Sequence, residues 1–381
     1  MWVSTPFIYF DDFRKINKKT RNRDKFLKFV SKCLRFRKLY KKVVETSITW
    51  FKFHTTYSFK DSASSRLNGW LNFVIQRNVE ELDLSVDSYR LPQFILNATS
   101  LTVLKLSALN LEDLPLSNFP SLKVLSISRV IRDAQSLQNI ISSCPVIENL
   151  QVSGRLWMDP VDLDFAVSTT LKYLSLSSVN FSRQWLEGLI SGLPLLERLT
   201  LESSKYCYDA KDISIHSHSL KSLYYYGRLN NISIHSHSLK VLSITVMDEP
   251  TKSFSFEGTF ITPNLVCLRL VCDAKSVISF EAPNLLEADL TLHKDKYTHS
   301  NDGIVHFLSN LNTVKKMVLC ISEQDIFFSE SIRSTCSPPL PNRKYLKVKI
   351  EDVHDHDELR KSELLDSLFW CAPSLETLTK F

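Results

Sequence analysis

The chain has 381 residues, of which 44% are hydrophobic, and a formal net charge of +6 at pH 7. Since this length exceeds that of a typical compact domain, the chain must either form more than one hydrophobic core or extend one core by adding repeats. Only 7 glycines are present, which argues against glycine-rich loops that cradle phosphate groups. No apolar run approaches the length of a membrane span, and the short motifs of serine hydrolases, zinc proteases and P-loop ATPases are missing. We therefore expect neither an enzyme nor a membrane partner.

The N-terminal ten residues are apolar but lack a basic leader, and Asp11 and Asp12 follow them directly. This pattern is not that of a secretory signal peptide, so we expect a cytoplasmic or nuclear location. The eight cysteines are scattered and form no CxxC pair. In a reducing compartment they are predicted to be free, mostly buried thiols.

Residues 14–42 are rich in lysine and arginine, and apolar side chains recur among them at helical spacing: Phe26, Leu27, Phe29, Val30, Cys33 and Leu34. The spacing predicts an amphipathic helix that caps the fold and exposes a basic face to solvent. The alternative is a patch for nuclear import or nucleic-acid binding. No nucleic-acid motif accompanies the charge, so nucleic acid is not an expected partner.

From Ile48 to the C-terminus one pattern recurs, Pro-x-Leu-x-x-Leu-x-Leu, and residues 120–127 show it in full. Its last two apolar residues are two positions apart and so face one side of a short strand, while the first closes the turn before that strand. The other copies carry the same apolar spacing: Ile48/Phe51/Phe53, Val79/Leu82/Leu84, Leu101/Leu104/Leu106, Ile147/Leu150/Val152, Leu171/Leu174/Leu176, Leu196/Leu199/Leu201, Leu220/Leu223/Tyr225, Leu239/Leu242/Ile244, Leu265/Leu268/Leu270, Leu285/Ala288/Leu290, Val314/Met317/Leu319, Tyr345/Val348/Ile350 and Leu375/Leu378.

The copies are separated by roughly 20 to 30 residues, the period of leucine-rich repeats. One repeat cannot bury its own apolar face, so neighbouring repeats must stack around a continuous core. The sequence therefore predicts an α/β leucine-rich-repeat solenoid with a curved parallel sheet and a mixed helical and irregular convex face. Helical patterns between the strands fall in these stretches: Leu67–Ile75, Ala134–Ser143, Gln184–Ser191, Ile304–Leu311 and Glu358–Trp370.

An almost verbatim duplication places Ile213–Lys221 and Ile232–Lys240 in adjacent repeats. Each copy contains a His-Ser-His triplet, and histidine is the commonest metal ligand. The histidines involved are His216, His218, His235 and His237. Because no carboxylate or thiol completes a site at matching spacing, we favour histidines that occupy the turn before each strand, and we expect no metal or cofactor.

The residues that flank the core leucines must point away from the core, onto the concave face of the sheet. Strands in neighbouring repeats lie about 5 Å apart, so these residues form ladders across the repeats. Tyrosine and arginine dominate the energetics of protein interfaces. The predicted partner-binding residues are Asn149, Gln151, Tyr173, Arg198, Tyr224, Tyr226 and Arg269.

Three segments resemble plant F-box proteins that carry leucine-rich repeats and a C-terminal FBD module. The first matches the segment that follows the F-box, at Trp2, Ser4, Pro6, Phe10 and Asp11. The second matches a helix-to-strand segment of that family, at Arg66, Asn68, Trp70, Arg77, Asn78, Val79, Glu81, Leu82, Asp83 and Leu84. The third, from Lys344 to Leu378, is similar to the FBD module, with a strand, a loop, a helix and a final short strand.

The resemblance implies a division into a post-F-box segment and basic helix (1–45), a repeat solenoid (46–330) and FBD-like repeats (331–381). F-box proteins of this kind are substrate receptors of the SCF ubiquitin ligase, in which the F-box binds the adaptor subunit and the repeats select the substrate. The F-box is not within residues 1–381, so the expected function is the substrate-recognition half. Its expected partner is a protein substrate, with the SCF adaptor added only if an F-box is restored upstream. The alternative is a ligase-independent interaction scaffold or a truncated gene product.

Overall fold

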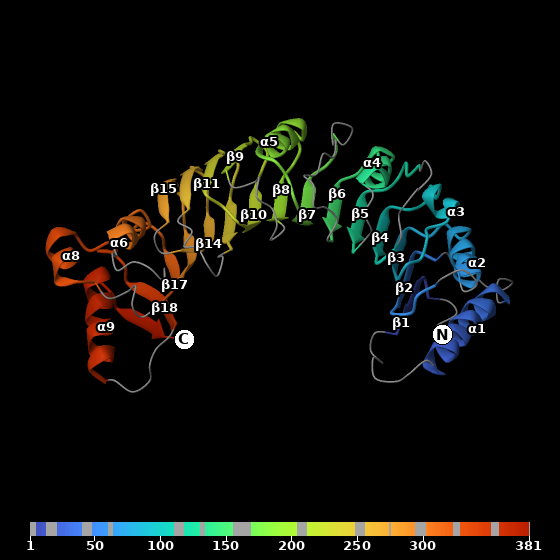
Figure 1. Ribbon diagram of the computed structural model, residues 1–381, viewed down its shortest axis with the longest axis horizontal. Coiled ribbons are helices and arrows are strands. Elements are labelled where there is room, and N and C mark those ends of the chain that lie inside the picture. The colour runs from blue at the N-terminus through green and yellow to red at the C-terminus, as the bar shows by residue number, and fades with distance from the viewer. Residues whose placement is uncertain are drawn as a thin grey trace. The chain divides into compact units, whose positions relative to one another are not determined.

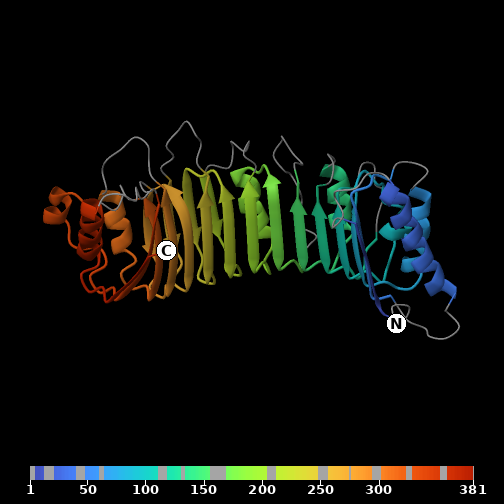
Figure 2. The ribbon, with the colours of Figure 1, turned by 90° about the horizontal axis from the view of Figure 1, so that it is seen from below.

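The computed structural model describes residues 5–12, 21–39, 48–59, 64–109, 118–129, 134–154, 169–203, 212–247, 256–273, 276–293, 302–322, 328–351 and 358–380. The chain divides into two compact units, residues 1–179 and 180–381. Figure 1 colours the first from blue to green and the second from green to red. In both units the strands run parallel to one another, and Figure 2 shows them as arrows lying side by side. A solenoid of leucine-rich repeats is confirmed by this architecture.

The first unit is a parallel sheet whose strands follow one another in chain order. Its strands are β1 (Phe7–Asp11), β2 (Trp50–Thr55), β3 (Glu81–Val86), β4 (Val103–Ser107), β5 (Val124–Ser128), β6 (Asn149–Ser153) and β7 (Tyr173–Val179). Its helices are α1 (Arg21–Leu39), α2 (Ser64–Ile75), α3 (Gln93–Leu96) and α4 (Ala134–Ser142). Figure 1 shows α2, α3 and α4 along one face of β2 to β6.

The repeated leucines form the core, as the repeat pattern predicts. Leu101, Leu104 and Leu106 are all buried, the first in the turn and the other two in β4. Backbone hydrogen bonds in the turn hold one repeat against the next. The N–H groups of Lys123 and Val124 both donate to the Thr102 carbonyl, at 2.8 and 3.0 Å. This paired donation recurs between many neighbouring repeats, so it fixes the register of the stack.

A left-handed residue follows each of the strands β3, β4 and β5. These residues, Ser88, Ala108 and Arg129, have φ values of 55°, 62° and 53°. The N–H of Ser88 donates to the Ala108 carbonyl and that of Ala108 to the Ser128 carbonyl, both at 3.0 Å. The chain thus leaves these strands through turns that are bonded to the next repeat, which offsets the strain of the positive φ.

The basic N-terminal helix is confirmed as α1, and it covers the core beneath the first strands. Leu27, Val30 and Leu34 are buried, and the ring centroids of Phe29 and Phe10 are 6.2 Å apart. The sequence analysis did not anticipate β1, which pairs with β2 in parallel from Phe7↔Trp50 to Asp11↔His54. Ile8 and Phe10 of this strand alternate inward, but no leucine-type spacing precedes them.

The second unit has one long sheet and a second, shorter sheet. The long sheet has the order β8-β10-β12-β14-β16-β17-β18-β19, with β8 (Arg198–Ser203), β10 (Ser222–Gly227), β12 (Val241–Val246), β14 (Cys267–Asp273), β16 (Glu287–His293), β17 (Lys316–Ser322), β18 (Tyr345–Glu351) and β19 (Thr377–Lys380). Its helices are α5 (Arg183–Gly192), α6 (Asp302–Ser309), α8 (Glu330–Thr335) and α9 (Glu358–Cys371).

The shorter sheet is built from the return segments of four successive repeats. Its order is β15-β13-β11-β9, with β9 (Asp212–His216), β11 (Asn231–His235), β13 (Glu257–Ile261) and β15 (Val277–Glu281). These return segments are too short for a helix, and their apolar residues alternate with period 2. Ile213 and Ile215 of β9 are both buried, as are Ile232 and Ile234 of β11. The part of the convex face expected to be irregular is therefore an ordered sheet here.

Seven of the eight cysteines lie in described residues, and these seven are free thiols, five of them buried. Burial raises the pKa of Cys144, Cys272 and Cys371 to about 12, so these thiols stay protonated at neutral pH. Cys207 lies outside the described residues. Across the part of the chain that is described, no helix is both long and apolar enough to cross a membrane.

Candidate protein-binding surface

The alternation of each strand determines which side chains form the outer surface of the sheet. The second and fourth residues of a strand such as β12 are buried, and the first, third and fifth are partly exposed. We call the surface formed by these odd positions the open face. Because the repeats are in register, the side chains at each odd position form a row that runs across the strands. Neighbouring strands in the row are about 4.8 Å apart.

Three of the predicted binding residues lie on the open face of the first unit. Asn149 and Tyr173 are register partners on β6 and β7, and Tyr173 is 36% exposed. Gln151 is exposed in the next row, where its Oε1 accepts a 3.5 Å hydrogen bond from Ser126. The Oδ1 atom of Asn149 is buried and has no hydrogen-bond partner. These three residues form a small polar group flanked by serines.

The other four predicted residues lie on the open face of the second unit. Tyr224 and Tyr226 are on β10, and Tyr226 is 43% exposed while Tyr224 is half-buried. Arg269 on β14 is in the same row as Tyr224, since Ser243 on β12 is the register partner of both. Arg198 on β8 is exposed. Its register partner is Ser222, so Arg198 lies in the row next to that of Tyr224. The register therefore brings Tyr224 and Arg269 to within two strand spacings of each other, about 10 Å.

Tyr225, which lies between these two tyrosines, shows how firmly β10 is held. Its ring is buried and its hydroxyl donates a 2.6 Å hydrogen bond to the Arg228 carbonyl. Tyr224 and Tyr226 consequently project from a strand that is anchored on its inner side. Large side chains on a rigid base lose little conformational entropy when they bind, and this favours their use as contact residues.

The structure also shows an aromatic group that the sequence analysis did not include. Phe7, Tyr9 and Trp50 lie at odd positions of β1 and β2, and Phe7 and Tyr9 are 59% and 46% exposed. The ring centroids of Phe7 and Trp50 are 6.2 Å apart, and those of Tyr9 and Trp50 are 6.3 Å apart. The Nε1 atom of Trp50 is buried without a hydrogen-bond partner.

A network of charges adjoins these rings on the same face. Lys52 Nζ lies 5.2 Å from the centroid of the Tyr9 ring and 3.5 Å from Asp83 Oδ2, while His54 Nε2 lies 2.7 Å from Asp83 Oδ1. Burial by itself would raise the pKa of Asp83, but the hydrogen bond with His54 and the positive charges of His54, Lys52 and Lys105 outweigh it and lower that pKa. Asp83 is thus held as a carboxylate at the centre of the network.

A sequence signal for this group was available. The repeat copies at Ile48/Phe51/Phe53 and Val79/Leu82/Leu84 place Trp50, Lys52 and Asp83 at flanking positions. The rule that selected Tyr224 would also have selected them. Phe7 and Tyr9 were missed for a different reason, because their strand lacks the leucine-type pattern that identifies a repeat.

The duplicated histidines occupy the shorter sheet rather than the open face. His216 and His235 end β9 and β11 as register partners, with ring centroids 4.8 Å apart, so the expectation that they lie in turns is wrong. His218 and His237 do lie in the turns that follow. Each ring of this pair lies near a serine of its own strand, His216 with Ser214 at 3.2 Å and His235 with Ser233 at 3.0 Å.

Within the described ranges, no three His, Cys, Asp or Glu side chains group closely enough to hold a metal ion. The absence of a metal or cofactor stays a prediction.

Comparison with known proteins gives matches in the repeat region. Residues 67–166 match the family model for the leucine-rich repeats of FBD-associated F-box protein At5g56370, and residues 171–194 match the leucine-rich-repeat model. The described residues of these two ranges include strands β3 to β7 and helices from α2 to α5. The predicted similarity to plant F-box proteins with leucine-rich repeats and an FBD module is confirmed.

Curated relatives come from Arabidopsis thaliana. F-box/LRR-repeat protein 13 is 34% identical over 100 residues, which are 25% of this chain and 22% of that protein. F-box protein At3g03040 is 38% identical over 104 residues, again 25% of this chain and 22% of the relative. F-box/FBD/LRR-repeat protein At1g78750 is 28% identical over 162 residues, 40% of this chain and 34% of the relative. The chain thus aligns with about a third or less of the length of these relatives.

Proposed function

We propose that this protein binds a protein partner through the open face of its repeats, as the substrate-recognition part of an SCF-type ubiquitin ligase receptor. Leucine-rich repeats and the similarity to proteins named F-box/LRR-repeat support a protein-interaction module. The ubiquitin-ligase role is the more specific part of the proposal, and we infer it from the class of protein to which the relatives belong. We assign the module no catalytic activity of its own and place it in the cytoplasm or nucleus.

The observation that carries the proposal is the row of side chains on β10 and β14. Tyr224 and Tyr226 project from an anchored strand, and Arg269 follows in the row of Tyr224. An aromatic side chain paired with an arginine can bury a large apolar area and also donate several hydrogen bonds. Residues of these types account for most interface hot spots. Tyr173 and the aromatic group of Phe7, Tyr9 and Trp50 extend the same chemistry onto the open face of the first unit.

The test replaces Tyr224 by alanine and compares partner recovery with that of the unmodified protein. We expect unchanged folding, because Tyr224 is only half-buried and makes no part of the core. Affinity for the purified partner should fall at least about tenfold, which corresponds to roughly 1.4 kcal/mol. Binding is measured by calorimetry after the partner has been identified by quantitative affinity purification.

Leu195→Ala serves as the matched control, since Leu195 is 50% exposed but lies in the turn before β8, away from the open face. A partner retained by Leu195→Ala and lost by Tyr224→Ala supports the proposal. Equal recovery by both variants would refute the role of this row.

The ligase role has a separate test. The SCF adaptor should co-purify with the protein expressed from its complete gene, and ubiquitylation of the partner should fall when Tyr224→Ala is introduced. A partner that binds through Tyr224 without adaptor recovery would instead favour the ligase-independent scaffold.

A further inference from the structure

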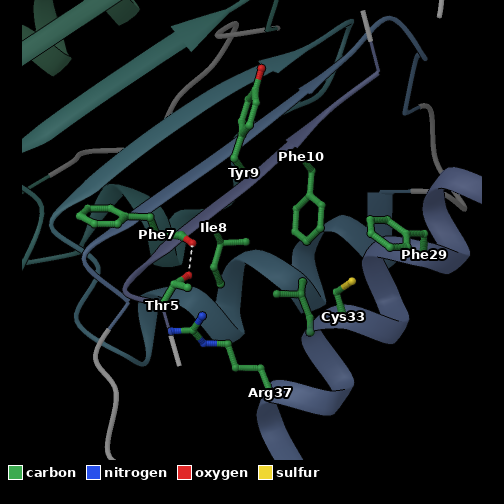
Figure 3. A pocket seen from close by; sticks show the side chains of 9 residues that line it. Thr5, Phe7, Ile8, Tyr9, Phe10, Phe29, Cys33 and Arg37 are labelled. Carbon is green, nitrogen blue, oxygen red and sulfur yellow. Dashed lines mark hydrogen bonds between the residues drawn. The ribbon is translucent and has the colours of Figure 1, made fainter. Parts of the chain in front are cut away.

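A cavity of about 300 Å³ lies between β1 and α1, at the N-terminal edge of the first sheet (Figure 3). Its lining is mostly apolar and consists of Thr5, Phe7, Ile8, Tyr9, Phe10, Phe29, Cys33, Leu34 and Arg37. This volume is at the lower end of the range for small-molecule sites, roughly 300 to 1,000 Å³. The cavity can therefore hold a small organic molecule, and its chemistry is set by Arg37, the one charged residue among the described residues that line it.

Arg37 is only 5% exposed, yet none of its three guanidinium nitrogens has a hydrogen-bond partner. In Figure 3 its side chain reaches from α1 toward Thr5 and Ile8. Burial and the nearby Arg77 guanidinium both lower the pKa of Arg37. A buried charge without a partner is costly, and buried charges in proteins are normally paired. The buried guanidinium of Arg37 is thus available to pair with an anionic group.

The polar groups around Arg37 do not supply that anion. The Thr5 hydroxyl donates a 2.7 Å hydrogen bond to the Phe7 carbonyl, and the remaining lining residues are apolar, aromatic or a thiol. Burial raises the pKa of Cys33, so its thiol is protonated and neutral. Arg77, the second cation, is turned to the Phe73 ring, 3.7 Å from its centroid, and does not line the cavity.

We propose that this cavity binds a small organic acid, with an apolar body and a single carboxylate. The carboxylate would accept two parallel hydrogen bonds from the guanidinium of Arg37, a geometry that the planar fork of arginine matches well. The apolar body would pack against Ile8, Phe10 and Leu34, which are buried along the cavity wall. A phosphate group fits less well, because one guanidinium and an apolar lining leave most of its oxygens without donors. The site is separate from the row of Tyr224 and does not depend on the proposed protein-binding function.

The experiment measures binding of benzoate, 3-phenylpropionate and hexanoate to the purified chain by thermal shift and calorimetry. We expect at least one of them to bind and to raise the melting temperature. The neutral 3-phenylpropionamide and the small anions acetate and phosphate should give no comparable shift. Failure of all three acids to bind would overturn the proposal, and so would an equal response to the amide or to acetate.

Two variants locate the binding. Arg37→Met should weaken binding at least about 30-fold, as expected when one partner of a buried charge pair is removed. Without ligand this variant should be as stable as the unmodified protein or more stable, because an unpaired buried charge is lost. Arg35→Met is the matched control, since Arg35 is exposed on the same helix. Unchanged binding by a folded Arg37→Met protein would refute the proposal.

Cys33→Phe provides the second variant, because it fills the cavity and leaves Arg37 in place. It should also abolish binding, and it decides the question if Arg37→Met does not fold. Binding by a correctly folded Cys33→Phe protein would show that the acid occupies another site.

Discussion

Arg343 and Arg37 are buried to a similar degree, 4% and 5% exposed, but their guanidinium groups have opposite surroundings. Arg343 donates to the Leu311 carbonyl at 3.0 Å and to the Val314 carbonyl, which are in the turns that follow α6. Its two terminal nitrogens are therefore paired with backbone carbonyls of the segment that follows α6. None of the three guanidinium nitrogens of Arg37 has a hydrogen-bond partner. Burial alone therefore does not distinguish the two arginines, whereas their hydrogen bonds do.

Asp83 gives a prediction about pH. Its pKa is lowered in the folded protein, so its contribution to stability is fully present above the unfolded pKa, about 3.9, and is lost as the pH falls through the folded pKa. Asp83→Asn should cost about 1 to 3 kcal/mol at neutral pH, as expected for hydrogen bonds to a charged group. Urea unfolding of both proteins at about pH 7 and about pH 3 measures this difference.

The difference between the two proteins should shrink at the lower pH, because about pH 3 lies below the unfolded pKa and the stabilisation that depends on the charge of Asp83 is then being lost. A stability difference that is the same at both pH values would show that the charge of Asp83 does not stabilise the fold. Asp289→Asn is a suitable control, since Asp289 is exposed at an odd position of β16.

The position of a candidate binding residue was predictable only where the repeat pattern fixes the direction of its side chain. Tyr224 flanks two core residues of an unambiguous copy, and the structure places it on the open face. Arg37 lies on the apolar stripe of α1, three residues after Leu34 and seven after Val30, and all three are buried. The helical spacing therefore indicates the face of the helix on which Arg37 lies. It does not show that the guanidinium lacks a hydrogen-bond partner, because that depends on how α1 packs against β1, and the sequence separates these two elements.

At the level of single elements, α5 has a defined N-terminal cap. The Ser182 side chain accepts a 3.2 Å hydrogen bond from the Trp185 N–H. Ser182→Ala should lower the free energy of unfolding by about 1 kcal/mol, because one N–H group at the helix start loses its partner. Ser182→Asp restores an acceptor and should recover most of that loss. Urea unfolding measures both variants, and equal destabilisation by alanine and aspartate would show that the cap does not stabilise the helix.

Helices were predicted well where an apolar stripe of several turns was present. Leu186, Leu189 and Ile190 of α5 are buried at the spacing that the sequence displays. The strands β9, β11, β13 and β15 were not anticipated, although Ile213 and Ile215 alternate. Five residues of alternation are compatible with a strand or an irregular turn, and pairing with the neighbouring repeats decides between them. The duplicated sequence makes this pairing favourable, because identical residues meet in register.

For the whole chain, the structure implies that stability is a sum over repeats and their contacts with nearest neighbours. Strand β14 pairs with β12 and β16, while β19 pairs with β18 on one side. Fluctuations that open one repeat should therefore affect its immediate neighbours most. Hydrogen exchange of backbone amides can measure this property strand by strand.

Leu268→Ala tests this expectation within the second unit. Leu268 is fully buried in β14, where its register partners are Leu242 and Ala288, so its truncation should cost about 2 to 5 kcal/mol. We expect exchange to accelerate most in β12, β14 and β16 and least in β18. Arg269→Ala is the control. Arg269 follows Leu268 in β14, its side chain is exposed on the open face, and its removal leaves the core intact. Equal acceleration in all strands would mean that the unit unfolds as one block, and the nearest-neighbour account would then be wrong.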